Sequence, residues 1–332
     1  MAQVGAGGGR TGPSGDNQYV NVATGNLLLQ GQDEQLQFRG LPVGQLRTYN
    51  SLGLATQVGA DGWLTGFERR VELLSGTLNA AGSVMRLHTG DGSFQDYAYL
   101  SANVYQSTAG GGAHDQLLWN GTTLSWKSVE GSTRREEHYA NHADAVLLGR
   151  LTRIVDTRSD GTTPTAWNVI YDASRRIAEI RSDDGTTTGD ALVFGYDANG
   201  RLITLSTREN GALRGQVGYE YDSVGRLAAV LVDLTPQDGV GDRDTWDAVT
   251  AANNNGYLFR TSYTYVDTTS LRIAQVRHSD GTLTSYTYDA SGRIRTVTQG
   301  DVNTNDADGA GLTLTFTYDV ANRSTDVSDS TG

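Results

Sequence analysis

A short phrase that recurs five times constrains this chain more than any other feature. Each copy begins with Tyr-Asp, continues through two mostly small residues and a turn position, and ends with Arg, usually followed by an aliphatic residue. A repeat on this scale predicts a stacked array in which no unit can bury its apolar face alone. The copies contain Tyr171, Asp172 and Arg176; Tyr196, Asp197, Gly200 and Arg201; Tyr221, Asp222, Gly225 and Arg226; Tyr288, Asp289, Gly292 and Arg293; and Tyr318, Asp319 and Arg323.

The copy around Tyr288 indicates how one unit folds. Tyr286 and Tyr288 are two residues apart, so an extended chain places both on one face, and the Thr and Ser residues around them suit a pleated sheet. Asp289 can accept hydrogen bonds from amides two residues on, and Gly292 supplies the positive φ that closes the turn. The segment from Arg293 to Thr298 then reads as a returning strand, which makes each copy an antiparallel hairpin.

Some copies depart from this pattern. Arg175 stands where other copies have Gly, so we expect a strained or altered turn there, whereas Asn322 in the last copy tolerates left-handed geometry. A degenerate copy spans 263–273, with Asp267 displaced by one position. The Asp and Arg of each copy are expected to satisfy turn amides and to pair with each other, because one carboxylate repeated in identical surroundings is structural rather than catalytic.

The phrase resembles the repeat of the Tyr-Asp (YD) repeat, or RHS, protein family. The match is closest at 196–202, 221–227 and 288–294. The opening stretches 22–29 and 46–51 also look like the segment that precedes the repeats in such proteins. The resemblance implies an all-β fold in which successive antiparallel hairpins form a curved or spiral, shell-like sheet after an N-terminal non-repetitive β segment.

The resemblance also implies a function. Members of the family are large secreted or cell-surface proteins, including bacterial toxins whose shell encloses a C-terminal toxin. The expectation is a non-catalytic structural segment, the N-terminal part of a longer array, that builds a β-shell enclosing or presenting a cargo or toxin domain. The alternative is a surface adhesin or a carbohydrate- or receptor-binding module that uses exposed Trp63, Trp119, Trp126 or Trp167, or rows of Tyr on a sheet face.

Partners and location follow from the same expectation. The predicted partners are the remainder of a longer chain or copies of the chain joined through open strand edges, together with a toxin cargo or a host-surface glycan or receptor. The formal net charge of −12 disfavours nucleic acid. The sequence shows no membrane-spanning apolar run and no secretory signal at its start. Secretion or cell-surface display is therefore expected from the resemblance alone.

Composition along the chain predicts three parts. Residues 1–15 are Gly-rich and are expected to form a flexible arm, residues 16–145 a β-rich leading segment, and residues 146–332 the repeat array. A short helix is predicted at 244–253. The absence of cysteine removes disulfides and thiolate metal sites.

No cofactor is indicated, and the metal candidate is one loop in which oxygen-bearing side chains alternate. The EF-hand pattern fails there, because Gly is missing at the sixth position and Leu312 stands where a bidentate acid belongs. A plain polar hairpin loop is therefore favoured over a calcium site. The stretch with Glu136, Glu137, His138 and His142 has a His-x3-His spacing, but on a strand the two histidines lie too far apart to chelate one ion, so a solvated polar edge is favoured over a metal site. The residues of the calcium candidate are Asp301, Asn303, Asn305, Asp306 and Asp308.

Overall fold

The regular structure of this protein is entirely β-strand. The computed structural model describes residues 3–5, 17–38, 41–52, 61–108, 115–121, 125–129, 135–156, 165–183, 189–233, 235–236, 258–279, 281–301 and 312–330. Within these ranges every regular element is a strand, which confirms the predicted all-β fold class. The helix predicted at 244–253 lies outside the described residues.

The chain divides into two compact units. One comprises Met1–Asp33, Leu46–Leu64 and Gly215–Gly332, and the other comprises Glu34–Gln45 and Thr65–Arg214. Each unit therefore combines part of the leading segment with part of the repeat array. The predicted division at residue 145 stays a prediction.

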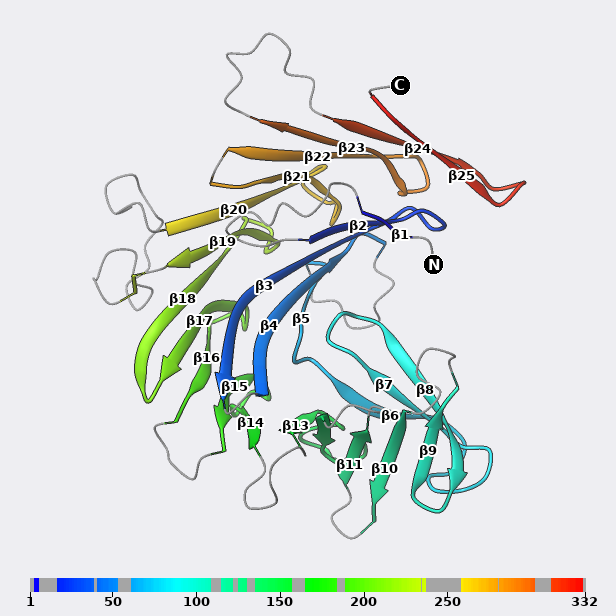
Figure 1. Ribbon diagram of the computed structural model, residues 1–332, viewed down its shortest axis with the longest axis vertical. Helices are drawn as coiled ribbons and strands as arrows, with labels where there is room; N and C mark the ends of the chain where they lie inside the picture. Colours follow the sequence, from blue (N-terminus) through cyan, green and yellow to red (C-terminus); the bar gives the residue numbers. More distant parts are fainter. Residues whose placement is uncertain are drawn as a thin grey trace. The chain divides into compact units, whose positions relative to one another are not determined.

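A first sheet is built from the N-terminal strands. Its order is β1, β2, β3, β4 and β5, and Figure 1 shows β3 and β4 as long neighbouring strands. Part of the predicted flexible arm is a strand, because β1 pairs with β2 and Val4 lies opposite Val20. The rest of that arm up to residue 16 lies outside the described residues. The strands are β1 (Gln3–Gly5), β2 (Asn17–Asn21), β3 (Asn26–Phe38), β4 (Leu41–Asn50) and β5 (Trp63–Thr65).

In the unit that contains residues 65–214, the remaining strands follow one another in chain order. From β6 to β17 consecutive strands pair antiparallel, as consecutive hairpins require. They are β6 (Arg70–Ser75), β7 (Val84–His88), β8 (Phe94–Ser101), β9 (Val104–Ser107), β10 (Gln116–Asn120), β11 (Ser125–Val129), β12 (Arg135–Tyr139), β13 (Leu151–Asp156), β14 (Thr165–Tyr171), β15 (Ile177–Ser182), β16 (Ala191–Tyr196) and β17 (Leu202–Glu209).

The other unit continues the same pattern with the later repeats. From β18 to β25 each strand again pairs antiparallel with its sequence neighbours, and the colours of Figure 1 follow this order from green to red. These strands are β18 (Ala212–Tyr221), β19 (Leu227–Asp233), β20 (Leu258–Tyr265), β21 (Ile273–Arg277), β22 (Thr282–Tyr288), β23 (Ile294–Asp301), β24 (Thr313–Asp319) and β25 (Ser324–Asp329).

A β-bulge recurs at the motif tyrosine. In five hairpins the register shifts immediately before this residue, which then lies opposite the aliphatic residue that follows the motif arginine. Every one of these aliphatic side chains is buried, so the bulge directs it into the core. The last hairpin differs, because β24 and β25 pair without a shift. The opposed pairs are Tyr171 and Ile177, Tyr196 and Leu202, Tyr221 and Leu227, Tyr265 and Ile273, and Tyr288 and Ile294.

Candidate functional site

The motif aspartate stabilises its turn by accepting hydrogen bonds from residues of that turn. At Asp222, Oδ1 accepts hydrogen bonds from the amides of Val224 (3.0 Å) and Arg226 (2.9 Å), and Oδ2 accepts from Nε of Arg226 (2.7 Å). The second guanidinium nitrogen of Arg226 lies 2.7 Å from the same Oδ2. Both carboxylate oxygens are thus occupied. The same four contacts form at Asp172, Asp197 and Asp289.

These bonds keep the aspartates ionised. At Asp172 the hydrogen bond from the amide of Arg176 is the largest influence that lowers the carboxyl pKa. At Asp197, Asp222 and Asp289, burial raises the pKa, but hydrogen bonds from the arginine amide and guanidinium outweigh it, so the pKa is lowered overall. A carboxyl group with a lowered pKa is poorly matched to general acid or base work near neutral pH.

The motif arginine also contacts the tyrosine of the next hairpin. The guanidinium carbon lies 4.4 Å from the ring centroid of Tyr196 for Arg176, 4.2 Å from that of Tyr265 for Arg226, and 4.3 Å from that of Tyr318 for Arg293. These distances are typical of cation–π contacts. Each arginine is thus held by its own aspartate on one side and by the following hairpin on the other.

The tyrosine hydroxyl completes the junction between hairpins. It donates to the carbonyl oxygen of the residue that follows the arginine. Burial raises the pKa of these tyrosines, to about 12 for Tyr318, so the hydroxyls stay protonated donors. We call this set, an Asp-Arg pair plus the tyrosine of the next hairpin, the repeat bracket. The bonds run from Tyr171 to Leu151 (2.7 Å), Tyr196 to Ile177, Tyr265 to Leu227, Tyr288 to Ile273 and Tyr318 to Ile294 (2.8 Å each).

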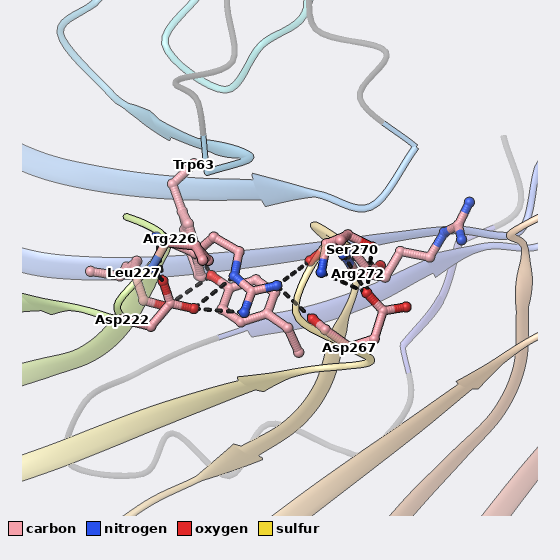
Figure 2. Close-up of polar contacts among 10 residues, drawn as sticks. Trp63, Asp222, Arg226, Leu227, Asp267, Ser270 and Arg272 are labelled. Carbon is pink, nitrogen blue, oxygen red and sulfur yellow. Dashed lines mark hydrogen bonds and ion pairs between the residues drawn. The ribbon is translucent and has the colours of Figure 1, made fainter.

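Figure 2 shows the bracket at Arg226. Besides its bonds to Asp222, this arginine donates from its other terminal nitrogen to the carbonyl oxygens of Asp267 (2.7 Å) and Ser270 (2.6 Å). The guanidinium therefore bonds to both its own turn and the turn of the next hairpin. Trp63 lies close by, and its Nε1 is 3.4 Å from the hydroxyl of Tyr265.

The degenerate copy loses one part of the bracket. Asp267 accepts hydrogen bonds from the amides of Thr269 and Ser270 (2.7 Å each). In the described part of the chain it forms no ion pair with Arg272, whose buried Nε has no hydrogen-bond partner. Arg272 still lies over the ring of Tyr288, 5.7 Å from its centroid. The one-residue displacement seen in the sequence thus separates the carboxylate from its arginine.

The turn position behaves as predicted in four copies and differently in the last. Gly200, Gly225 and Gly292 have positive φ, and Arg175 adopts the same conformation with φ of 65° while keeping the turn hydrogen bonds of the other copies. That turn is therefore strained but not altered. The prediction for the last copy is wrong: there the positive φ of 53° falls at Arg323 rather than at Asn322.

The last turn is displaced because it lacks the bulge. Asp319 lies opposite Ser324 in the ladder, so the turn begins one residue later than in the other copies. Asp319 accepts hydrogen bonds from the amide of Asn322 (3.0 Å) and from its side chain (2.6 Å). Arg323 forms no ion pair within the described residues.

The side chains of the calcium candidate lie outside the described residues. Asp301 ends β23, and its side chain lies outside the described residues together with Asn303, Asn305, Asp306 and Asp308. Among the residues that are described, no three His, Asp or Glu side chains cluster in a way that could hold a metal ion. The described part also contains no helix long and apolar enough to cross a membrane.

Sequence reasoning missed a buried ion pair in the unit that contains the later repeats. The side chains of Asp33 and Arg47 are 2% and 4% exposed and lie 3.0 Å apart. The hydroxyl of Tyr219 donates to Asp33 (2.8 Å), Arg47 donates to the hydroxyl of Tyr263 (2.8 Å), and Arg47 also stacks over Trp63 at 4.6 Å. Buried charges are stable in a protein interior only when they are paired and hydrogen-bonded in this way. No local pattern marks the two residues as partners.

A second buried cluster corrects the predicted polar edge. The Glu137 side chain is only 5% exposed, because the alternation of β12 turns it inward. It pairs with Arg69 and with Arg135 (3.1 Å) and accepts from the hydroxyl of Tyr139 (2.5 Å). Burial raises its pKa, but the positive charges of Arg69 and Arg135 outweigh this, and the pKa is lowered.

The four tryptophans proposed as an exposed binding platform are buried. Their exposed fractions are 7% for Trp63, 8% for Trp119, 1% for Trp126 and 0% for Trp167. Three of the indole nitrogens also donate within the fold: that of Trp63 to the hydroxyl of Tyr265, that of Trp126 to Nδ1 of His142 and that of Trp167 to the carbonyl of Leu41. These four rings are therefore not available for the alternative binding role.

Residues 17–97 match one family, "Domain of unknown function (DUF6531)". No curated protein matches the chain. Similar solved structures include the TcdB2-TccC3-Cdc42 complex, with 13% identity over 88% of this chain and a TM-score of 0.29. They also include TcdB2-TccC3, with 12% identity over 94% of this chain and a TM-score of 0.30.

A porin-like protein from Bacteroides uniformis is also similar, with 12% identity over 80% of this chain, 96% of that chain and a TM-score of 0.28. The chain spans only 16% and 20% of the two TcdB2-TccC3 chains. All three TM-scores lie below the level that implies a shared overall arrangement.

Proposed function

We propose that this chain is a non-catalytic structural segment of a large secreted or cell-surface protein, in which it builds a β-shell that encloses or presents a C-terminal cargo or toxin domain. One observation carries the proposal: the polar groups of the repeat are used within the repeat bracket. The aspartate is bound by amides and arginine, the arginine by aspartate and tyrosine, and the tyrosine by a carbonyl. Groups satisfied in this way join hairpin to hairpin, and within the described part of the repeats they form no convergent reactive set.

The adhesin or carbohydrate-binding alternative is not favoured. It relies on aromatic rings that a ligand can reach, and the four tryptophans considered for this role are buried. The proposed partners are the remainder of a longer chain or further copies that add to a strand edge, together with the cargo. Nucleic acid remains an unfavourable partner for a chain with a net charge of −12.

Limited proteolysis of the natural full-length protein tests the proposal. We expect the polypeptide that follows the array to resist protease while the array is intact, and to become sensitive when Arg226→Ala weakens a bracket. Arg277→Ala is the matched control, because Arg277 is exposed and has no ion pair among the described residues. Rapid digestion of the following polypeptide beside an intact, protease-resistant array would contradict enclosure.

A further inference from the structure

Three tyrosines of the repeats hydrogen-bond to the N-terminal part of their own unit. Each stands two residues before a motif tyrosine, and each is buried. We call residues 17–33, 46–52 and 61–64 of this unit the leading strands. The hydroxyl bonds join Tyr219 to Asp33 (2.8 Å), Tyr263 to Arg47 (2.8 Å) and Tyr286 to Gln18 (2.7 Å).

The remaining copies carry no hydroxyl at this position. Val169 and Phe194 occupy it in the first two copies and Phe316 in the last, and all three are buried. In the unit that contains it, Phe194 packs edge-on against Phe67 with ring centroids 6.3 Å apart. A tyrosine therefore occupies this position in the three repeats where its hydroxyl has a polar partner on the leading strands. In the other copies the residue is apolar.

The same three repeats present a second group to the leading strands. The bulge takes the amide of the residue after the arginine out of the regular ladder, and a buried amide without an acceptor is costly. The amide of Ile294 donates to the carbonyl of Gly25 (2.8 Å), and that of Ile273 donates to the hydroxyl of Tyr49 (3.0 Å). The amide of Leu227 donates to the carboxylate of Asp61. Each bulge amide thus has an acceptor on the leading strands.

Each of three consecutive repeats is therefore held at two points, a tyrosine hydroxyl and a bulge amide. We propose that these paired groups form a register-specific docking surface whose occupant is the chain's own leading strands. The match assigns Asp33 and Asp61 to the repeat with Tyr219 and Leu227, Arg47 and Tyr49 to the repeat with Tyr263 and Ile273, and Gln18 and Gly25 to the repeat with Tyr286 and Ile294.

Hydrogen-bond direction and buried charge make the register of the leading strands against the repeats specific. Tyrosine donates to Asp33 and to Gln18 but accepts from Arg47, and the Asp33–Arg47 pair is desolvated as a unit. A shift by one repeat toward the C-terminus would place Gln18 opposite Phe316, which has no hydroxyl. It would also separate buried charges from the groups that satisfy them, a strong penalty against the wrong register.

Close approach at Gly25 supports the same docking. Its φ is +69°, and a Cβ atom there would lie 2.3 Å from Cβ of Arg293. The carbonyl of Val22, nearby in sequence, also accepts a hydrogen bond from the hydroxyl of Thr325 (2.7 Å). The backbone of the leading strands at Gly25 is thus in close contact with the repeats. The docking surface is independent of whether the chain encloses a cargo.

Amide hydrogen exchange of the full chain tests the proposal. Tyr286→Phe removes one hydroxyl and should speed exchange of the amides at 17–21 by about fivefold, the equivalent of one hydrogen bond. Tyr196→Phe is the control, because that hydroxyl bonds to Ile177 within the other unit. Unchanged exchange at 17–21 in Tyr286→Phe, or an equal effect of the control, would overturn the proposal.

A double variant decides the outcome if a single substitution has wider effects. Gln18→Met removes the acceptor of the Tyr286 hydroxyl, together with the 3.4 Å bond from Nε2 of Gln18 to Oγ1 of Thr284. Because both substitutions break one contact, the pair should speed exchange by less than the product of the two single effects. Fully multiplicative effects would show that the two side chains act independently and would contradict docking at this point.

Discussion

The guanidinium of Arg226 lies 4.2 Å from the ring centroid of Tyr265, while the hydroxyl of that tyrosine bonds to the carbonyl of Leu227, the residue that follows the arginine. One tyrosine thus holds two adjacent residues of the preceding hairpin. Because Arg226 is also bound by Asp222, a turn is joined to the next strand through a single side chain. Damage to one repeat bracket should therefore weaken two hairpins.

Arg226→Lys should destabilise the protein. Lysine cannot make the forked contact with Asp222 or stack as a planar group, so we expect a loss of about 1–3 kcal/mol in the free energy of unfolding. Urea unfolding measures the difference. Arg277→Lys serves as the control at an exposed site in the same unit, and equal midpoints for the two variants would contradict the prediction.

Arg175→Gly should stabilise the protein. Arg175 has a φ of 65°, and its exposed side chain can be removed while its carbonyl still accepts from Arg150. The relief of left-handed strain, less the greater chain entropy of glycine, should give about 0.5–1 kcal/mol. Thermal unfolding provides the measurement. The reverse change, Gly200→Arg, should lower the melting temperature, and a shift in the same direction for both variants would argue against strain.

Acid should weaken the brackets. The pKa of Asp222 in the folded protein lies below its ordinary value of 3.8, so the folded state binds fewer protons than the unfolded state. Its contribution is present above the unfolded value and is lost as the pH falls through the folded value. Asp222→Asn should be less stable than the parent at neutral pH and should lose less stability below about pH 4. Parallel curves of unfolding free energy against pH would exclude this linkage.

Asp61 should have the opposite pH dependence. Burial is the largest influence on its carboxyl pKa and raises it above 3.8, although hydrogen bonds from the amides of Trp63 and Leu227 lower it in part. The folded state thus binds more protons, and the stabilisation is lost as the pH rises through the folded value. Asp61→Asn keeps a side-chain acceptor without the charge. Its stability relative to the parent should increase with pH across this window, and a constant difference would refute the prediction.

Gly25→Ala should be far more damaging than Gly82→Ala. Both glycines have positive φ, but a Cβ at Gly25 would lie 2.3 Å from Cβ of Arg293, whereas nothing lies within 4 Å of a Cβ at Gly82. Both variants carry the left-handed penalty, and only Gly25→Ala adds overpacking of about 1–3 kcal/mol. Chemical unfolding of the two variants compares them directly. Equal losses in the free energy of unfolding would mean that the backbone at Gly25 can shift to relieve the clash, and would contradict the prediction.

The local half of the repeat bracket could be predicted from sequence, because Asp222, Gly225 and Arg226 lie in one turn whose chemistry is set by neighbouring residues. The other half could not. The contact of Arg226 with Tyr265, and that of Tyr219 with Asp33, joins residues far apart in the chain and depends on how hairpins stack.

Other misses have equally physical causes. Glu137 was expected at a solvated edge because a polar run hides the strand phase that turns it inward. A usable signal did exist in the residue two before each motif tyrosine, which is Tyr219, Tyr263 or Tyr286 where the leading strands dock and Phe or Val in the other copies. Only the contacts reveal that this choice distinguishes repeats.

The two ends of the hairpins are under different restraint. Bracket turns keep one length in the four regular copies, whereas the connections at the opposite end range from residues 210–211 to residues 234–257. A peptide epitope or a small reporter domain spliced between β19 and β20 would leave the bracket turns untouched. Insertions should therefore be tolerated better at the variable ends of these hairpins than in the four regular bracket turns, where an added residue would separate Asp from Arg as it does in the degenerate copy.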